Sequence, residues 1–247
     1  MEDEANGKPK DIAGPILGAA DFGENGGDMR IPSWYPDFRS VPSWRIFRIM
    51  AEFIEGFEFL ADFKKEVTFF GSARTPEGNH HYEEARKLGR LLGEAGFTII
   101  TGGGPGIMEA GNRGATEAGA ESIGLNIQLP REQRTNPYVK RGKGFYYFFT
   151  RKVMLSASAQ AYVFFPGGFG TMDELAEMLM LIQTGKMSPI PIVLIGKEYW
   201  EGLTKWVVEN MLTNGYIEEK DLGLFKVVET AEEAFEIIKD SPERPFF

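Results

Sequence analysis

Cysteine is absent from the 247-residue chain, and histidine occurs only at His80 and His81. Without cysteine there can be no disulfide, no thiol nucleophile and no thiolate-bound metal, a pattern compatible with a cytosolic protein. The two histidines are adjacent and lack the spaced partners that a metal site needs. We therefore expect no metal centre and predict a cytoplasmic location.

Long apolar runs and an excess of positive charge are also missing. No stretch reaches about 18 consecutive apolar residues, and the acidic start Met1-Glu2-Asp3-Glu4 has no apolar signal region. The formal net charge of −9 opposes sequence-independent binding to nucleic acid or to an anionic membrane. We accordingly expect neither nucleic acid nor a membrane as a partner, and any phosphate-bearing ligand should be small and locally held.

Three segments of the chain differ in their pattern. Residues 1–42 are rich in glycine, proline and acidic residues without a sustained period, and we expect an irregular N-terminal extension. Residues 43–64 carry apolar side chains at three- and four-residue spacing, which predicts an amphipathic helix whose aromatic face packs on the main domain or on another subunit. Residues 65–247 are long enough for one α/β domain with its own core.

From residue 65 onward, short β-branched or aromatic runs alternate with helical patterns. Such alternation predicts an α/β fold with a doubly wound, mainly parallel sheet, helices on both faces, and ligands outside the carboxyl ends of the strands. The expected strands are Val67 to Phe70, Phe97 to Thr101, Ser122 to Ile127, Phe145 to Phe149, Ala161 to Phe165, Ile192 to Ile195 and Leu224 to Val228.

The most informative motif is Pro166-Gly167-Gly168-Phe169-Gly170-Thr171-Met172-Asp173-Glu174, which joins an expected strand to a helical stripe. Glycines at a helix N-terminus let a phosphate approach the unpaired backbone N–H groups and the positive end of the helix dipole. Thr171 can cap the helix or bind the phosphate. Glu174 would repel a phosphate unless it faced another part of the ligand, such as ribose hydroxyls. A plain glycine turn followed by a favourable first-turn acid is the alternative explanation.

Two further glycine turns follow expected strands. Gly71-Ser72-Ala73-Arg74 supplies a flexible backbone, a hydroxyl and a guanidinium that can grip a phosphate, although a solvated loop arginine explains it equally well. Gly102-Gly103-Gly104-Pro105-Gly106 opens a helix, and its glycines indicate close approach of backbone or ligand. The chain completes neither the dinucleotide fingerprint nor a Walker motif, so a mononucleotide is favoured over NAD or ATP.

The basic pair Arg151-Lys152 is expected at the start of a helix, just after the strand Phe145 to Phe149. A cation at that place opposes the helix dipole, so a local anion would account for the pair, and two solvated basic residues are the alternative. The polar loop from Leu129 to Tyr138 leads to the same strand. We expect this loop to border the same crevice as a lid or a subunit contact.

Together, Gly102 to Gly106, Arg151-Lys152 and Pro166 to Glu174 resemble the Lonely Guy family of phosphoribohydrolases, often mislabelled lysine decarboxylases, whose hallmark is P-G-G-x-G-T-x-x-E. The resemblance covers about Glu66 to Ile238. It implies that residues 65–247 form a Rossmann-like, nucleotide-binding catalytic domain. The implied reaction is hydrolysis of the N-glycosidic bond of a nucleoside 5′-monophosphate, of the AMP or cytokinin riboside type. It further implies that no cofactor is needed and that the protein is a homo-oligomer, a dimer or higher.

The same resemblance assigns roles to residues of the site. Arg151 and Glu174 correspond to the catalytic pair, and Gly168, Gly170 and Thr171 correspond to the phosphate site. With the other turns and the basic pair, the expected substrate- and phosphate-binding residues are Gly71, Ser72, Arg74, Gly103, Gly104, Gly106, Lys152, Gly167, Gly168, Phe169, Gly170 and Thr171.

Two other functions compete with hydrolysis. A non-catalytic nucleotide-binding or carrier protein can use a related fold, although Arg151 and Glu174 together favour an enzyme. Amino-acid decarboxylation with pyridoxal phosphate is disfavoured, because no lysine is set in the context of a Schiff base. Asp173 replaces a glutamate found in many members of the family, and Glu109 replaces a glycine usual in its cytokinin-activating members. The preferred base therefore stays open.

Overall fold

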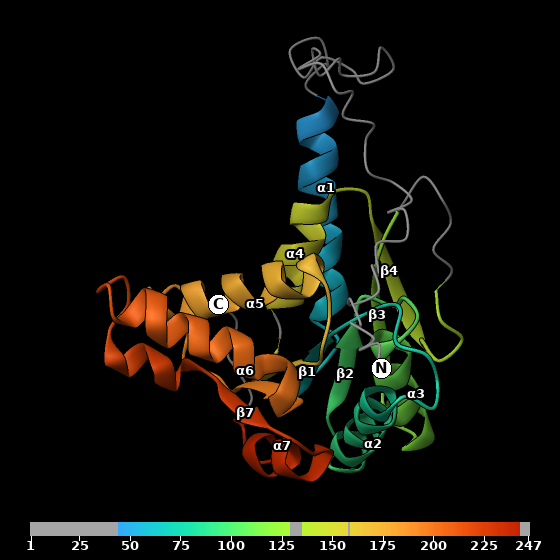
Figure 1. Cartoon of the computed structure of the whole chain (residues 1–247). Coiled ribbons are helices and arrows are strands. Elements are labelled where there is room, and N and C mark those ends of the chain that lie inside the picture. Colours follow the sequence, from blue (N-terminus) through green and yellow to red (C-terminus); the bar gives the residue numbers. More distant parts are fainter. Residues whose placement is uncertain (1–43, 129–134, 158, 243–247) are drawn as a thin grey trace, which may run out of the picture. The chain divides into compact units, whose positions relative to one another are not determined.

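The computed structural model describes residues 44–128, 135–157 and 159–242 (Figure 1). The expected extension 1–42 and residues 129–134 of the polar loop lie outside this part. The described chain contains a seven-stranded sheet in the order β4-β3-β2-β1-β5-β6-β7, and every neighbouring pair is parallel. This confirms the predicted α/β fold. The strands are β1 (Glu66–Phe70), β2 (Thr98–Thr101), β3 (Ser122–Ile127), β4 (Arg141–Phe145), β5 (Ala161–Phe164), β6 (Ile192–Ile195) and β7 (Lys226–Val228).

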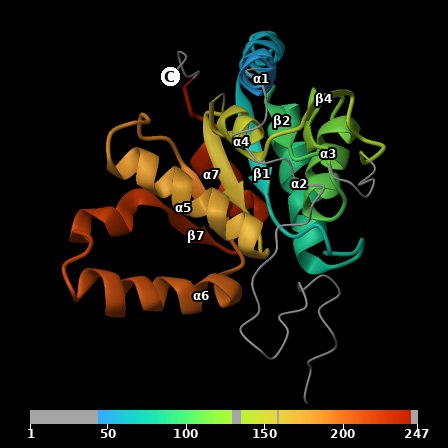
Figure 2. The ribbon, with the colours of Figure 1, turned by 90° about the horizontal axis from the view of Figure 1, so that it is seen from above.

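Helices cover both faces of the sheet (Figure 2). Alternate residues of a strand point to opposite faces, so the fully buried strand β1 contributes to two cores. The face that receives Val67 and Phe69 is covered by α2 (His80–Glu94), α3 (Ile107–Glu117) and α7 (Ala231–Ile238). The face that receives Phe70 is covered by α1 (Trp44–Leu60), α4 (Phe148–Ala157), α5 (Phe169–Gln183) and α6 (Lys197–Trp206). A π-helical segment (Val207–Leu212) continues α6, and a 3-10 helix (Glu219–Leu224) precedes β7.

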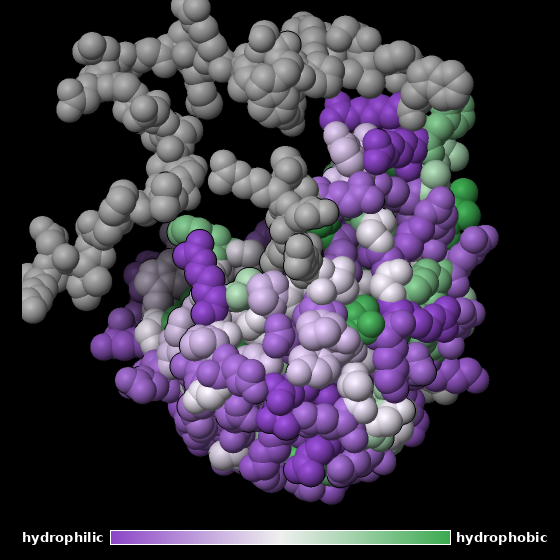
Figure 3. All heavy atoms as spheres, turned by 90° about the vertical axis from the view of Figure 1, so that its right-hand side faces the viewer, coloured by the Kyte–Doolittle hydropathy of each residue, from purple (hydrophilic) through white to green (hydrophobic). Residues whose placement is uncertain are grey.

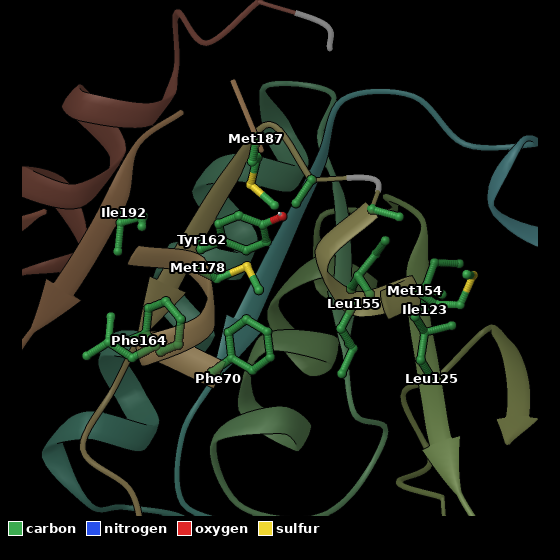
Figure 4. Packing of buried hydrophobic residues seen from close by; sticks show 14 of the residues in the cluster. Phe70, Ile123, Leu125, Met154, Leu155, Tyr162, Phe164, Met178, Met187 and Ile192 are labelled. Carbon is green, nitrogen blue, oxygen red and sulfur yellow. Dashed lines mark hydrogen bonds between the residues drawn. The ribbon is translucent and has the colours of Figure 1, made fainter. Parts of the chain in front are cut away.

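The core beneath α4 and α5 combines aliphatic side chains with aromatic and sulfur-containing ones (Figure 4). Phe70 stacks on Phe164 with ring centroids 4.8 Å apart and an interplanar angle of 14°. Beside them, the hydroxyl oxygen of Tyr162 lies 3.8 Å from the sulfur of Met187. Phe70 and Phe164 are the last residues of β1 and β5, so this packing fixes the two strand ends that lead into the turns before α2 and α5.

The outward faces of α2 and α3 are charged and form a mainly hydrophilic surface (Figure 3). Arg86 of α2 lies 2.6 Å from Glu117 of α3, and Arg113 lies 3.2 Å from the same carboxylate. Exposed pairs of this kind contribute at most about 1 kcal/mol each. Across the described ranges, no helix combines the length and apolar character needed to span a bilayer.

The strand predicted at Phe145 to Phe149 is wrong in its position, because β4 ends at Phe145 and α4 begins at Phe148. Aromatic residues favour strands in general. Here the carboxylate of Glu52, on α1, accepts hydrogen bonds from the backbone N–H groups of Tyr146 at 2.9 Å and Tyr147 at 3.3 Å. These bonds bind the backbone that would have continued the strand, and a helix starts instead.

Candidate functional site

A cavity of about 690 Å³ lies at the carboxyl ends of β1, β2 and β5. From β1 the strand order runs outward in both directions, through β2 on one side and β5 on the other. Doubly wound folds bind ligands at such a switch point. The lining residues are Phe69, Phe70, Gly71, Ser72, Ala73, Arg74, Thr75, Gly102, Met108, Arg151, Leu155, Pro166, Gly167, Gly168, Phe169, Gly170, Thr171 and Glu174.

The turn between β5 and α5 is held in place by its neighbours. The backbone N–H of Ser72 donates to the carbonyl oxygen of Pro166 at 3.0 Å. The hydroxyl of Tyr199, on α6, donates to the carbonyl oxygen of Gly167 at 2.6 Å. A Cβ atom on Gly167 would lie 2.7 Å from the Cβ atom of Thr171, so the backbone of this turn leaves room only for glycine.

The N-terminus of α5 opens onto the cavity. Gly168 is the N-cap residue of α5 and has no side chain with which to cap the helix. Cβ atoms on Gly168 and Gly170 would meet no described residue within 4 Å, and the side chain of Phe169 is 96% exposed. A phosphate can therefore approach the first N–H groups of α5, where the helix dipole also favours an anion.

Glu174 lies one turn inside α5 and is only 7% exposed. Burial raises the pKa of Glu174 to about 7, although the positive charges of Arg151 and Lys152 oppose the shift. The Oε2 atom is buried and has no hydrogen-bond partner among the described residues. A carboxyl that titrates near neutral pH with a free oxygen is typical of groups that bind a hydroxyl or take part in catalysis.

Arg151 reaches the same cavity from the first turn of α4. Its guanidinium carbon lies 5.5 Å from the ring centroid of Phe148, and its Nη1 atom lies 3.6 Å from the position of a Cβ atom on Gly102. The Nε atom is buried without a partner in the part of the chain that the structure describes. Burial lowers the pKa of Arg151 and the charge of Glu174 raises it, and the guanidinium stays protonated at neutral pH. The cavity thus holds a half-buried positive charge whose Nε atom no described side chain binds.

The two members of the basic pair separate in the fold. The ammonium nitrogen of Lys152 lies 2.8 Å from a carboxylate oxygen of Asp173 and 3.0 Å from one of Glu177, both on α5. Lys152 does not line the cavity. The structure therefore brings Arg151 to the cavity and uses Lys152 to join α4 to α5.

The turn after β1 lines the cavity and packs against α3. A Cβ atom on Gly71 would lie 2.7 Å from the Cγ2 atom of Ile107, so a larger residue would displace α3. The carbonyl oxygen of Ser72 accepts a hydrogen bond from the N–H of Ile107 at 3.1 Å. The hydroxyl oxygen of Ser72 accepts one from the N–H of Arg74 at 3.0 Å. All three predicted residues of this turn, Gly71, Ser72 and Arg74, line the cavity, and Arg74 is exposed.

The turn after β2 reaches the cavity through Gly102. Gly103 has a φ of +70°, and a Cβ atom there would lie 2.6 Å from the side-chain nitrogen of Asn126. Gly106 also has a φ of +70°, and a Cβ atom there would lie 2.8 Å from the carbonyl carbon of Ala73. Gly103 therefore lets this turn pack against β3, and Gly106 lets it pack against the turn after β1. Within the described residues, the cavity lining does not include the predicted Gly103, Gly104 and Gly106.

A buried polar network behind the turn after β2 was not predicted. The side-chain oxygen of Asn112, on α3, accepts from the hydroxyl of Thr101 at 2.6 Å and from the side chain of Asn136 at 3.0 Å. The side-chain nitrogen of Asn112 donates to the hydroxyl of Ser122 at 2.9 Å. Asn112 is fully buried, and such satisfied networks fix backbone geometry. An asparagine on the buried face of a helix is the local signal that could have revealed it.

The cavity also has an apolar wall that the glycine motifs did not indicate. Phe69 and Phe70 come from the end of β1, Leu155 from α4 and Met108 from α3. The sulfur of Met108 lies 2.8 Å from the position of a Cβ atom on Gly102. Such a wall suits a flat, partly apolar group, and its sequence signal is the position of Phe69 and Phe70 just before the first glycine turn.

Solved structures share this fold. The X-ray structure of TM1055 aligns with a TM-score of 0.53 at 25% identity, over 71% of this chain and 98% of that one. The molybdenum cofactor carrier protein of Chlamydomonas reinhardtii aligns with a TM-score of 0.51 at 23% identity, over 71% of this chain and 96% of that one. The likeness to the carrier protein shows the fold alone.

Known sequences give the family. The cytokinin riboside 5′-monophosphate phosphoribohydrolase LOG of Oryza sativa subsp. japonica is 27% identical over 177 residues, which are 69% of this chain and 71% of that protein. The pyrimidine/purine nucleotide 5′-monophosphate nucleosidase of Escherichia coli (strain K12) is 29% identical over 149 residues, 55% of this chain and 33% of that protein. The relatives confirm the resemblance to Lonely Guy proteins. Residues 108–238, more than half of the chain, match the family described as possible lysine decarboxylase, and the chain belongs to that family.

Proposed function

We propose that this protein hydrolyses the N-glycosidic bond of a nucleoside 5′-monophosphate and releases a free base and ribose 5-phosphate. One observation carries the proposal: the half-buried Arg151, the buried Glu174 and the open N-terminus of α5 share one cavity. The names of the relatives from Oryza sativa and Escherichia coli support the same reaction and the same class of substrate.

The cavity suits a mononucleotide in size and in the distribution of its groups. A volume of about 690 Å³ is within the range of small-molecule sites. In the proposed complex the phosphate binds at Gly168, Gly170 and Thr171, where the first N–H groups of α5 are accessible. The apolar wall that includes Phe70 and Met108 packs against the base.

Hydrolysis breaks the bond between C1′ of the ribose and a nitrogen of the base, and the electron pair leaves with the base. The oxygen of a water molecule bonds to C1′, this water loses a proton and the base gains one. The ribosyl centre carries positive charge in the transition state, as in other glycoside hydrolyses. Ionised Glu174 stabilises that charge, binds ribose hydroxyls and orients the water.

Arg151 supplies a fixed positive charge in the cavity. It can bind phosphate or ribose oxygens, or polarise the departing base, and the split between binding and turnover in Arg151→Gln separates these roles. A positioned acid or base contributes about 10²- to 10⁴-fold to a rate, so orientation of the bound nucleotide supplies much of the remainder.

The test is direct. Purified protein is incubated with AMP, GMP, CMP, UMP and N6-isopentenyl-AMP, and free base is followed by chromatography beside Glu174→Gln. We expect base release by the wild type, a near-complete loss in Glu174→Gln, and retained nucleotide binding by that variant. Full activity in Glu174→Gln would remove Glu174 from the mechanism. Nucleotide binding without base release by the wild type would favour a carrier or binding protein instead.

A further inference from the structure

Glu52 is a buried acidic residue on α1, and its contacts are made with the segment that leads to Arg151. The side chain is 9% exposed. Its carboxylate accepts the backbone N–H of Tyr146 at 2.9 Å and that of Tyr147 at 3.3 Å. It also accepts the hydroxyl of Thr150 at 2.6 Å. Three donors around the entry to α4 thus converge on one carboxylate from another helix.

These contacts act as a cap at the start of α4. The first backbone N–H groups of a helix lack partners inside it, and a side-chain oxygen normally satisfies one of them. Glu52 binds the N–H groups just ahead of α4 and places a negative charge at the positive end of the helix dipole. Removing one partner of a buried, charge-assisted network leaves donors unsatisfied, so the entry to α4 depends on this carboxylate.

The same contacts continue to Arg151. The backbone N–H of Arg151 donates to the carbonyl oxygen of Tyr147 at 3.3 Å. Tyr147 therefore donates its own N–H to Glu52 and accepts a hydrogen bond from Arg151. Farther along the two helices, a Cβ atom on Gly56 would lie 2.6 Å from the sulfur of Met154. This close approach of α1 and α4 leaves little freedom for α4 to slide.

Other links between α1 and the neighbouring strand are exposed. Asp62, two residues after the end of α1, lies 2.6 Å from Arg141 of β4, and Glu55 of α1 pairs with Lys143 of β4. Such surface pairs are individually weak. Glu52 differs from them because it is buried and binds the entry to the helix that carries Arg151.

We propose that Glu52 is a positioning residue for the nucleotide site, which sets the first turn of α4 and so holds the guanidinium of Arg151 in the cavity. The inference rests on the proposed function, because it takes Arg151 to act on a bound nucleotide. It gives α1 a role at the site, although α1 lies outside the residues 108–238 that the family match covers.

The first test is Glu52→Gln, which keeps the shape of the side chain but replaces an acceptor oxygen with a donor amide facing backbone N–H groups. We expect kcat/KM for AMP to fall about 10- to 100-fold, because small misplacements of a site residue have effects of this size. The exposed Glu58→Gln, on the same helix, and Asp62→Asn, which removes the pair with Arg141, should stay within about twofold of the wild type.

A double variant separates positioning from general damage. If Glu52 acts through Arg151, then Glu52→Gln should cause little further loss in a protein that already carries Arg151→Gln. If the two losses of kcat/KM multiply in the double variant, the proposal is overturned. Thr150→Val keeps the volume of a fully buried side chain and removes the hydroxyl bound to Glu52. This variant should also lose activity. It tests the same contact if Glu52→Gln does not fold.

The pH profile provides a readout that a merely structural change would not move. The charges near Glu174 are Arg151 and Lys152, which lower its pKa, and Asp173 and Glu177, which raise it. Displacement of Arg151 should therefore raise the pKa of Glu174. The acid limb of the activity profile should move to higher pH in Glu52→Gln, in the same direction as in Arg151→Gln.

A spectroscopic measurement keeps this inference separate from the proposed reaction. The Nε–H resonance of Arg151 is assigned by its loss in Arg151→Lys and then compared among the wild type, Glu52→Gln and Glu58→Gln. We expect a clear shift or broadening only in Glu52→Gln, whether or not any nucleotide is hydrolysed. An unchanged Arg151 resonance in folded Glu52→Gln would overturn the positioning role, whereas absence of base release by the wild type would overturn the function alone.

Discussion

The Cβ atom of Thr171 lies 2.7 Å from the point that a Cβ atom on Gly167 would occupy, and the hydroxyl oxygen of Thr171 lies closer still. A side chain at Gly167 would therefore displace the first turn of α5. At Gly170, in contrast, a Cβ atom would meet nothing within 4 Å in the part of the chain that the structure describes. The packing of the protein thus requires the first of these glycines and leaves the space beside the second open to a ligand.

Alanine substitutions at these two positions should have opposite effects on stability. Gly167→Ala should lower the free energy of unfolding by about 1–3 kcal/mol, because the backbone or Thr171 must move. Gly170→Ala should leave stability unchanged or raise it by up to about 1 kcal/mol, since alanine favours a helix more than glycine does. Urea unfolding of both variants measures these changes.

Nucleotide binding completes the comparison. If phosphate approaches the backbone at Gly170, its alanine variant should bind AMP at least about tenfold more weakly although it is as stable as the wild type. Isothermal titration calorimetry would show this. Wild-type affinity in Gly170→Ala would place the phosphate elsewhere in the cavity.

Burial of Glu174 should make stability depend on pH. Its pKa is raised from 4.5 to about 7, so between these values the folded state keeps a proton that the unfolded chain releases. Stability then falls as pH rises through this window, by roughly 3 kcal/mol in total. Glu174→Gln removes the charge, so we expect its Tm to exceed that of the wild type at pH 8 and to differ much less at pH 5. An equal difference at both pH values would show that Glu174 has an ordinary pKa in the folded protein.

The separation of the basic pair predicts unequal effects of two neighbouring substitutions. Arg151→Gln should lower kcat/KM for base release by about 100-fold or more, because it removes a positive charge that lines the cavity. Lys152→Gln should lower it by less than about tenfold, because Lys152 pairs with Asp173 and Glu177 away from the cavity lining. Steady-state kinetics of both variants decides the matter, and similar losses would mean that Lys152 also contacts the nucleotide.

The sheet and the main glycine motif could be predicted because their signals are local. β5 and β6 are short buried runs, and the strand, the glycine turn and the first turn of α5 occupy consecutive residues. The start of α4 could not be predicted in this way. It depends on Glu52, which precedes Tyr146 by 94 positions, and no window of neighbouring residues contains that contact.

The cavity lining was predictable only in part for a similar reason. Glycine indicates that something comes close to the backbone, but it does not say whether a ligand or another part of the protein does so. At Gly103 the neighbour is the side chain of Asn126, and at Gly106 it is the backbone of Ser72 and Ala73. Only the fold shows which glycines remain open to the cavity.

The raised pKa of Glu174 finally predicts how activity should depend on pH. In the proposed reaction the ionised carboxylate stabilises the ribosyl centre, and with a pKa of about 7 it is mostly protonated at pH 6. Activity of the wild type should therefore rise from pH 6.5 to about pH 8 and then level off. The second ionisation of a phosphate ester lies near pH 6, so it accounts for little of the change in this range.

Initial rates at low and at saturating AMP, measured from pH 6.5 to 9, provide the check. Arg151→Lys is a useful companion because it keeps a positive charge beside Glu174, so any residual activity should show an acid limb close to that of the wild type. A profile that is flat across this range would mean that Glu174 is already ionised at pH 6.5. A profile that falls as pH rises would mean that the protonated carboxyl is the active form, and Glu174 would then act as an acid toward the departing base.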